Sequence, residues 1–357
     1  MGFEQQSNVD DKTKGSSIEL PLERFGQGTQ SLSVLMLFKA YSEILMRENT
    51  DENAIAILGL EEPEVHLYPQ AVRSLWTFLK KIDQQKVVST HSTFFIQEAD
   101  LISLRLLKRK NNIVQSFSIQ QTFEIRLPKH NDLLTLCNAN DNLSFTSFPP
   151  TDGGQEIGTF TIKGKLETAH HQELLRVYNG DAANELKIND LNERSKIFLT
   201  EDELFDLKYY TERIRGEVFF AKAWLLCEGQ SEYLLLRYFA QLMGKDLDQN
   251  GVSVIDYKNN GSAGLFISLA KHFDMPWLLL SDNDQAYRDT INELNGREIP
   301  QSDIDNYVNT YPTENTDFEL FLYQNGFKDD YLEILIPDKT LYPRQSYRIV
   351  KKIDIKK

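Results

Sequence analysis

The sequence predicts an α/β protein built from two sheet-containing parts and a connector between them. Near both ends of the chain, short apolar runs alternate with amphipathic stretches of helical length. This alternation is typical of parallel strands joined by helices. A more polar stretch lies between the two ends. We therefore expect a first part at residues 1–110, an irregular or helical connector at 111–215, and a parallel sheet flanked by helices at 216–357.

The first part contains two apolar runs suited to buried parallel strands. Residues 54–60 form one run and lead directly into Glu61 and Glu62, while residues 86–90 form the other and lead into His91. Paired acids after a strand can hold Mg²⁺ and polarise an attacking water, and a histidine beside them can sense a γ-phosphate. Taken singly, the acids also fit a solvated loop, and the histidine also fits a structural role.

A glycine-containing loop precedes these strands. Gly26, Gln27 and Gly28 stand just before a strongly amphipathic helix, and glycines at a helix start expose backbone N–H groups to an anion. In this order, the loop, the acidic pair and the histidine resemble the C-terminal lobe of an ABC-type ATPase. The resemblance implies that the loop is the signature, Glu61 and Glu62 are the Walker B acids, and His91 is the switch histidine, all contacting nucleotide.

The chain contains no G-x-x-x-x-G-K-[ST] motif to cradle phosphates. We therefore expect ATP hydrolysis by this chain alone to be unlikely. ATP would be bound through a partner chain that carries a P-loop or through a missing N-terminal segment. In ABC-type proteins the signature loop completes a partner's site, so the resemblance also implies a homodimer or higher oligomer formed through the ATPase lobe.

The last part reads as strands and helices in strict alternation. Strands are expected at residues 221–227, 252–257 and 277–281, and helices at 231–243 and 263–273. In a parallel sheet of this kind, functional side chains gather where the strands end at their carboxyl termini.

Two pairs of acids stand at such strand ends. Glu228 and Glu232 flank a tight turn and the first turn of a helix, and Asp282 and Asp284 alternate on an extended segment. Each pair can therefore face one point above the sheet, and hard oxygen ligands suit Mg²⁺ or Mn²⁺. A helix N-terminus for the glutamates and a simple turn for the aspartates are the alternative readings.

The E-G-x-x-E and D-x-D pattern resembles the Toprim domain, a Rossmann-like parallel sheet. An ABC-type lobe followed by Toprim resembles the OLD (overcoming-lysogenization-defect) family of ATP-dependent endonucleases, to which the Gabija nuclease subunit of phage defence is related. The resemblance implies DNA cleavage by two Mg²⁺ or Mn²⁺ ions per site, gated by the ATPase part, in antiviral defence or DNA repair. It makes Glu228, Asp282 and Asp284 catalytic and adds Glu232 and Glu319 as metal ligands.

Two further elements of this family are expected. Residues 259–262 would form a loop that contacts phosphate or metal-bound water, or else a plain turn. A late lysine would stabilise charge at the scissile phosphate, with Lys339, Lys351 and Lys352 as candidates. The competing hypothesis is a non-catalytic regulatory subunit that senses nucleotide bound by a partner chain.

The composition fits a globular protein with an ordinary core. Hydrophobic residues make up 41% of the 357 residues, and no apolar run is long enough for a membrane span. A net charge of −14 argues against bulk coating of nucleic acid and is compatible with carboxylate metal sites. Two widely separated cysteines and a polar N-terminus predict a cytoplasmic protein.

Overall fold

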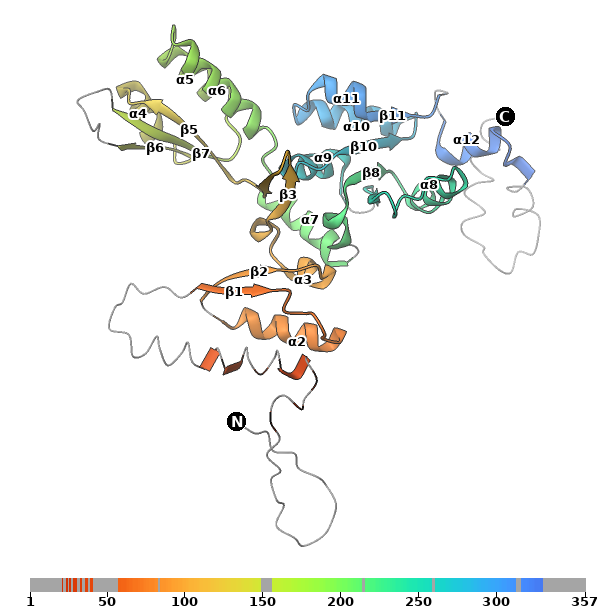
Figure 1. Cartoon of the computed structure of the whole chain (residues 1–357). Helices are drawn as coiled ribbons and strands as arrows, with labels where there is room; N and C mark the ends of the chain where they lie inside the picture. The colour runs from red at the N-terminus through yellow and green to blue at the C-terminus, as the bar shows by residue number, and fades with distance from the viewer. Residues whose placement is uncertain are drawn as a thin grey trace. The chain divides into compact units, whose positions relative to one another are not determined.

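The computed structural model describes most of the chain and divides it into two compact units, residues 1–98 and 99–357. Figure 1 colours the chain by residue number. Besides scattered positions between 21 and 40, the described residues are 57–82, 84–148, 156–213, 216–258, 261–312 and 316–329.

The first unit contains a two-stranded parallel sheet in its described part. Strand β1 (Ile57–Glu61) pairs with β2 (Gln85–Ser89), and helix α2 (Pro69–Lys80) connects them. Helix α3 (Thr93–Glu98) follows. These elements enclose a small core: Leu58, Val72, Leu75, Leu79, Ile82 and Phe95.

The parallel pairing of β1 and β2 agrees with the sequence pattern, but only one face of this sheet is covered in the described part. Ile57 and Val87 remain 63% and 61% exposed. The side chains of a strand alternate between the two faces of its sheet. In the described part of the predicted runs, Leu58 and Leu60 contact the core of this unit, whereas Ile57 and Val87 are exposed.

The second unit begins with a hairpin formed by β3 (Leu106–Lys110) and β4 (Ile113–Phe117). Its two-residue turn, Asn111 and Asn112, has positive φ angles of 49° and 63°, which asparagine tolerates and tight hairpins require. Lys108 donates to the backbone oxygen of Asp274 over 2.8 Å. This basic segment is thereby attached to the C-terminal sheet domain, and the first unit ends at residue 98.

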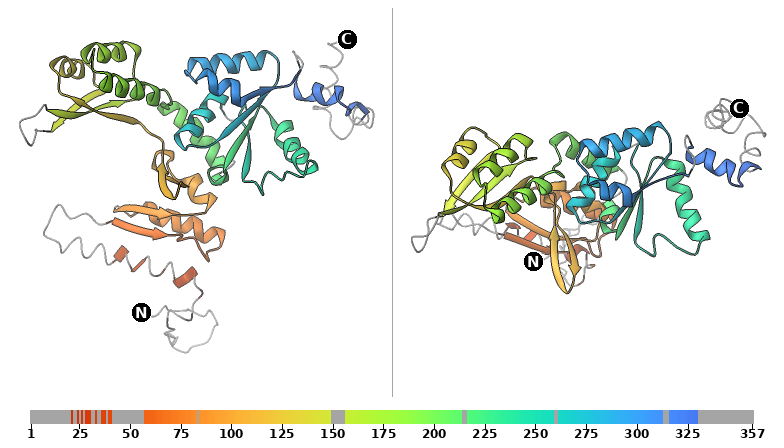
Figure 2. Two further views of the ribbon diagram at one scale, coloured as in Figure 1. Left: turned by 45° about the horizontal axis from the view of Figure 1, so that its top comes forward. Right: turned by 90° about the horizontal axis from the view of Figure 1, so that it is seen from above.

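The connector is a folded module and is more regular than its polar sequence suggests. Strands β5 (Thr122–Pro128), β7 (Ile157–Lys163) and β6 (Leu143–Phe148) form an antiparallel sheet in that order. Helices cover one side of it (Figures 1 and 2): α4 (Asn131–Asn138), α5 (Thr168–Val177) and α6 (Ala182–Ser195). Strands β4 and β5 follow each other in the chain but belong to different sheets.

Helix α7 (Glu201–Arg213) leads into the C-terminal domain, whose sheet has the order β11-β10-β8-β9. All its described pairings are parallel. The sequence prediction of a parallel sheet with helices is confirmed. The bounds are β8 (Ala223–Cys227), α8 (Gln230–Leu242), β9 (Val252–Asp256), α9 (Ala263–His272), β10 (Trp277–Ser281), α10 (Gln285–Gly296), α11 (Gln301–Tyr307), β11 (Val308–Thr310) and α12 (Phe318–Gln324).

The connections of this sheet reverse direction at β8. The chain passes from β8 outward to β9 and then returns across β8 to β10. Right-handed crossovers consequently place α8 on one face and α9 with α10 on the other, as Figure 2 indicates. The reversal puts the switch point of the sheet at the carboxyl ends of β8 and β10, which is where ligands bind in sheets of this type.

Helix α9 lies inside the second unit and is buried over almost its whole length. His272 at its end accepts a hydrogen bond from the Gln120 backbone N–H at Nδ1, and its Nε2 bonds to the Ile197 backbone oxygen. Burial lowers the pKa of His272 to about 4, so the ring is neutral at pH 7. The connector and the C-terminal domain are thereby joined through an uncharged histidine.

Candidate functional site

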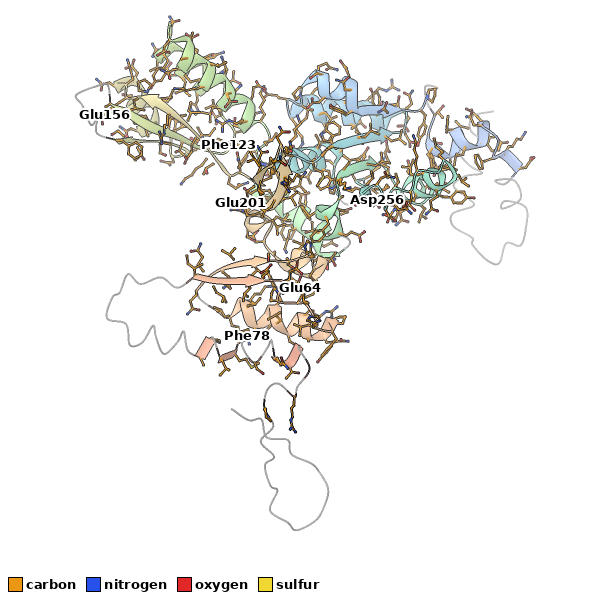
Figure 3. All side chains as sticks on the ribbon, in the orientation of Figure 1. Glu64, Phe78, Phe123, Glu156, Glu201 and Asp256 are labelled. Carbon is orange, nitrogen blue, oxygen red and sulfur yellow. The ribbon has the colours of Figure 1, made fainter. Side chains whose placement is uncertain are left out.

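The pairing of β8 with β10 brings together the two acidic motifs of the C-terminal domain. Leu280 pairs with Cys227 across the two strands, so the residues that follow each strand emerge side by side. Glu228 follows β8 and Asp282 follows β10. The neighbouring strand β9 ends in Asp256, which Figure 3 labels.

Glu228 is buried, and both of its carboxylate oxygens have partners. Oε1 accepts hydrogen bonds from the Ser281 hydroxyl at 2.7 Å and from the Asp282 backbone N–H at 3.1 Å. Oε2 lies 2.7 Å from the ammonium of Lys258. The side chain of Glu228 is therefore fixed in one orientation at the end of the sheet.

Glu232 lies in the first turn of α8 and is also buried. Its Oε2 lies so close to Gly229 that a Cβ there would meet it at 3.3 Å. Burial is the main cause that raises the pKa of Glu232, and the charges of Glu319 and Glu228 add to it, while backbone hydrogen bonds oppose the rise. The carboxylate thus contacts the helix start, as the alternative reading held, and also lies in the field of two other acids.

Asp282 has the most perturbed carboxyl group of the site. Burial, followed by the negative charges of Glu228, Glu232 and Asp317, raises the pKa of Asp282 to about 7. Its Oδ1 accepts a hydrogen bond from the Phe318 backbone N–H at 3.0 Å, which opposes the rise. An acid whose charge is disfavoured to this degree gains strongly from a cation placed beside it.

Asp284 has a structural contact in addition to its place in the cluster. Its Oδ1 accepts a hydrogen bond from the Ala286 backbone N–H at 2.7 Å and so caps the N-terminus of α10. Its charge also acts on Lys258. The alternative reading expected a simple turn here, whereas Asp284 caps a helix and also acts on a residue of the site.

The segment from Thr316 to Glu319 joins the cluster from the far end of the domain. Asn283 and Thr316 form an antiparallel bridge, with the Asn283 backbone N–H 2.9 Å from the Thr316 oxygen. Glu319 accepts a hydrogen bond from the Ser231 hydroxyl at 2.9 Å. Asp317 is buried at the start of α12 and accepts from the Leu320 backbone N–H. Glu228, Glu232, Asp282 and Glu319 thus lie close enough for their charges to interact, and Asp284 acts on the neighbouring Lys258.

A buried hydroxyl adds to this polar cluster. Tyr311 Oη is inaccessible to solvent and has no hydrogen-bond partner among the described residues. Burial and the charges of Glu232, Asp282 and other neighbours raise the pKa of Tyr311, so its hydroxyl stays protonated. An unpartnered buried hydroxyl among crowded carboxylates fits a site that holds cations with their water. As they stand, no three acid, histidine or cysteine side chains of the described residues are arranged around one ion position.

Several residues of the cluster were not predicted from the sequence. Lys258 lies two residues after β9, Ser231 and Ser281 each bond to a predicted ligand, and Asp317 stands two residues before Glu319. The two serines and the lysine lie near strand ends, and this position is the signal in the sequence that could have pointed to them. Lys339, Lys351 and Lys352 lie outside the described residues, as do Asn259 and Asn260 of the expected loop.

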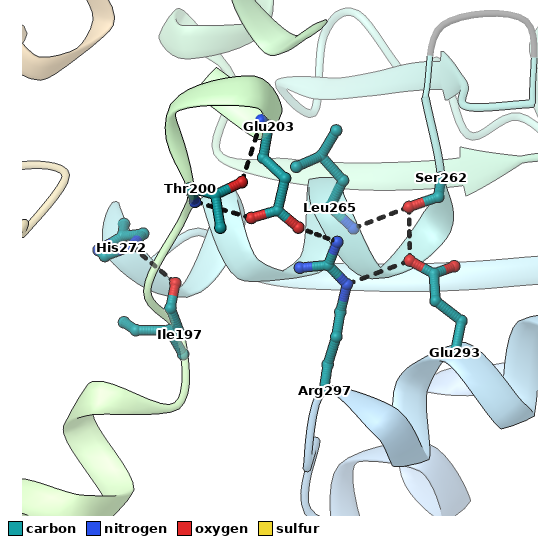
Figure 4. A network of polar contacts seen from close by, with 8 residues as sticks. All are labelled: Ile197, Thr200, Glu203, Ser262, Leu265, His272, Glu293 and Arg297. Carbon is teal, nitrogen blue, oxygen red and sulfur yellow. Dashed lines mark hydrogen bonds and ion pairs between the residues drawn. The ribbon is translucent and has the colours of Figure 1, made fainter. Parts of the chain in front are cut away.

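A network of polar contacts fixes the end of this loop (Figure 4). Ser262 caps α9 by accepting from the Leu265 backbone N–H, and its hydroxyl donates to Glu293 over 2.5 Å. Arg297 donates to Glu293 at 3.1 Å and to Glu203 of α7 at 2.5 Å. The loop that carries Lys258 is therefore anchored, through Ser262, to helices α10 and α7.

The nucleotide-binding residues expected in the first unit lie on exposed segments. Glu61 ends β1, and Glu62 lies 3.2 Å from the ring of His91. Glu64, labelled in Figure 3, accepts hydrogen bonds from the backbone N–H groups of His91 and Ser92, each at 3.2 Å. The acidic loop after β1 thus contacts the loop of His91 after β2. The contact is made through Glu64, a third acid that was not predicted from the sequence.

The glycine loop of the first unit approaches the same region. A Cβ at Gly28 would lie 2.9 Å from the His66 backbone oxygen, so only glycine fits there. Gly26 is exposed, and Gln27 lies outside the described residues. The glycine and acidic loops are therefore neighbours within this unit.

Comparison with known proteins finds a family match within each of the two units. A family described as overcoming lysogenization defect protein-like, TOPRIM domain, matches residues 219–284, and an AAA ATPase domain matches residues 1–96. The OLD nuclease of Thermus scotoductus is 22% identical over 275 residues, covering 75% of this chain and 37% of that protein. The Old nuclease of Escherichia phage P2 is 25% identical over 175 residues, covering 47% and 28%.

Among solved structures, the C-terminal region of the Xanthomonas campestris pv. campestris OLD protein aligns with 38% of this chain and 72% of that one. The identity is 21% and the TM-score is 0.30. The family model that matches residues 219–284 makes the C-terminal domain a Toprim domain. The chain is a relative of the OLD nucleases, with an AAA ATPase domain ahead of its OLD-like Toprim domain. It spans less than two fifths of the length of these two nucleases.

No helix in the described part of the chain has the length and apolar character needed to cross a membrane.

Proposed function

We propose that the protein is a metal-dependent DNA endonuclease whose Toprim site hydrolyses phosphodiester bonds. The observation that carries the proposal is that the buried Glu228 and Glu232 and the half-buried Asp282 meet at the switch point of the sheet. Burial and the neighbouring acids destabilise the charged forms of Glu232 and Asp282 unless cations lie beside them. The nuclease names of the Toprim relatives support the same assignment.

The residues divide naturally into two groups of ligands. Asp282, Asp284 and Glu228 would hold one ion, and Glu232 and Glu319 would hold the other. Two bound Mg²⁺ or Mn²⁺ ions would supply activation of a water and charge stabilisation of the leaving oxygen. Ser281 and the Asp282 backbone N–H orient Glu228, and Ser231 orients Glu319. Such second contacts hold ligands in place and raise metal affinity.

The AAA ATPase unit would control access to this site. The pairing of Glu62 with His91 in the first unit provides an acid and a histidine at adjoining strand ends, as γ-phosphate sensing requires. ATP would reach this unit through a partner chain or another segment that supplies a P-loop. DNA would be the substrate of the complete assembly, and an oligomer formed through the ATPase unit would bring its signature loop to a partner's nucleotide.

The proposal is tested with Glu228→Ala and Asp282→Ala variants of the full chain, assayed on plasmid and linear DNA with Mn²⁺ or Mg²⁺. Loss of a metal ligand should reduce cleavage at least about 100-fold. Asp289→Ala is the matched control, because Asp289 is an exposed acid of the same domain that contacts Gln285. Equal cleavage by all four proteins would refute the nuclease assignment.

A regulatory subunit is the second candidate, since the sequence contains no P-loop motif. In that case the wild-type chain would cut neither DNA nor RNA with either metal, and it would change the nucleotide hydrolysis of a P-loop partner. RNA offered in competition in the same assay identifies the nucleic acid that is cut.

A further inference from the structure

Lys258 is the cationic residue that the structure places against the carboxylate cluster. It follows β9, and its ammonium lies 2.7 Å from Glu228 Oε2. The lysine side chain is 57% exposed, whereas that of Glu228 is 4% exposed. The ammonium therefore contacts the buried carboxylate from the solvent side, at the edge of the sheet where a substrate would approach.

The charges around Lys258 keep it protonated. Partial burial lowers the pKa of Lys258, but the hydrogen bond to Glu228 and the charges of Glu228, Asp282 and Asp284 outweigh that cost and raise it. All three acids belong to the proposed ligand set. A divalent cation bound by these acids would repel the ammonium, because the two positive charges would compete for Glu228 Oε2.

The lysine is free to move in response, while its loop is anchored nearby. A four-carbon stem with an exposed head can shift by several ångström without disturbing the core. Four residues further on, Ser262 is held by Glu293 and by the N-terminus of α9. This combination keeps the ammonium within reach of the cluster and allows it to leave Glu228.

Building on the proposed function, we infer that Lys258 exchanges between two anions. It neutralises Glu228 when the carboxylates hold no cation, and it contacts a phosphate oxygen of the nucleic acid when a divalent cation takes Glu228. Lysine is a common point-charge partner of phosphate, and a cation at the scissile group stabilises the charge that develops there. The residue thus supplies, from the middle of the domain, the positive charge expected of a late lysine.

A purely structural ion pair makes the opposite prediction for metal binding. If Lys258 only stabilises the fold, its removal would leave metal affinity unchanged or lower it. If it competes with the metal for Glu228, its removal should tighten metal binding and still slow cleavage. Metal affinity would then rise while the cleavage rate falls. A loss of folding would instead lower both.

The experiment measures Mn²⁺ binding by calorimetry without DNA, and cleavage at saturating Mn²⁺, for wild type, Lys258→Met and Lys258→Arg. Lys258→Met should bind Mn²⁺ about twofold to fivefold more tightly, the range of an ion pair with one exposed partner. It should cleave about 100-fold more slowly. Lys258→Arg keeps the charge, so both changes should be smaller.

A matched control is Lys245→Met, which removes an exposed lysine elsewhere in the same domain and should resemble wild type. Binding to DNA with Ca²⁺, which allows binding to be measured apart from cleavage, gives a second reading. The slope of log affinity against log salt should fall by about one unit in Lys258→Met. Thermal unfolding verifies that every variant is folded.

The outcomes separate the inference from the function on which it rests. Unchanged or weaker Mn²⁺ binding by folded Lys258→Met would identify a structural pair, and unchanged cleavage would exclude a phosphate contact. A wild-type chain that neither binds Mn²⁺ nor cleaves DNA would overturn the proposed function and this inference with it.

Discussion

Both units place acids at the ends of parallel strands, yet they expose those acids to water very differently. In the first unit the Glu62 side chain is 39% exposed and faces an exposed His91. In the second unit Glu228 is 4% exposed. Strand β8 has a neighbour on each side, whereas β1 has β2 alone beside it in the described part. An acid at a strand end is therefore buried only where flanking strands and helices screen it from water.

The largest expected effect is on DNA cleavage, and it distinguishes the acidic site of the Toprim domain from that of the first unit. Glu232→Gln should reduce Mn²⁺-dependent cleavage at least about 100-fold, because it removes a buried ligand among other acids. Glu62→Gln should leave cleavage without nucleotide unchanged and should weaken any response to ATP. DNA cleavage is measured with and without ATP for both variants. A strong loss in Glu62→Gln without nucleotide would mean that the two sites are not separable.

The next effect concerns the network that anchors the Toprim loop. Arg297→Ala leaves Glu203 and Glu293 without their shared cation, and the arginine side chain is only 20% exposed. We expect a loss of about 1–3 kcal/mol in the free energy of unfolding, below the range of a fully buried pair. Chemical denaturation measures it.

Arg194→Ala is the control for this network, since its pair with Asp190 is exposed and should contribute at most about 0.5 kcal/mol. Equal losses in the two variants would show that the Arg297 cluster behaves as an ordinary surface ion pair.

A smaller effect should appear as a dependence of stability on pH in the metal-free protein. The carboxyl of Asp282 has an ordinary pKa of 3.8 and a folded pKa of about 7. Between these values the folded protein binds more protons than the unfolded chain, so its stability falls as the pH rises from about 4 to about 7. Thermal unfolding in EDTA should therefore show a lower melting temperature at pH 8 than at pH 5.5.

Asp282→Asn should remove this dependence and raise the melting temperature at pH 8, by about 2–4 °C for each kcal/mol regained. Mn²⁺ should stabilise the wild type at pH 8 and the variant much less. A variant with the same pH profile as the wild type would assign the effect to another group.

Much of the Toprim domain could be predicted from the sequence because its signals are local. The apolar runs before Glu228 and Asp282 give the strands, and parallel topology then brings their ends together. Helix starts and strand ends agreed with the pattern within about two residues, as expected of such boundaries. The metal roles of these acids stay predictions.

Other features depend on contacts that the sequence does not encode locally. Strand β7 lies between β5 and β6, so the connector sheet requires pairings between strands that are far apart in the sequence. The polar loops between these strands made the strand pattern difficult to recognise. Asp317 reaches the site only because Asn283 pairs with Thr316. Lys258 was missed for a similar reason: its importance comes from Glu228, which is 30 residues away.

The lack of a side chain at Gly264 should restrict how related sequences vary. A side chain at this position would meet Glu293 Oε1 at 2.5 Å and the Arg297 side chain at 2.6 Å. The bare backbone of α9 is what allows the guanidinium to lie against it. We expect positions 264 and 297 to change together among relatives. Chains with a larger residue at the first position should have lost the arginine at the second, and this correlation marks which relatives tie the loop to α7.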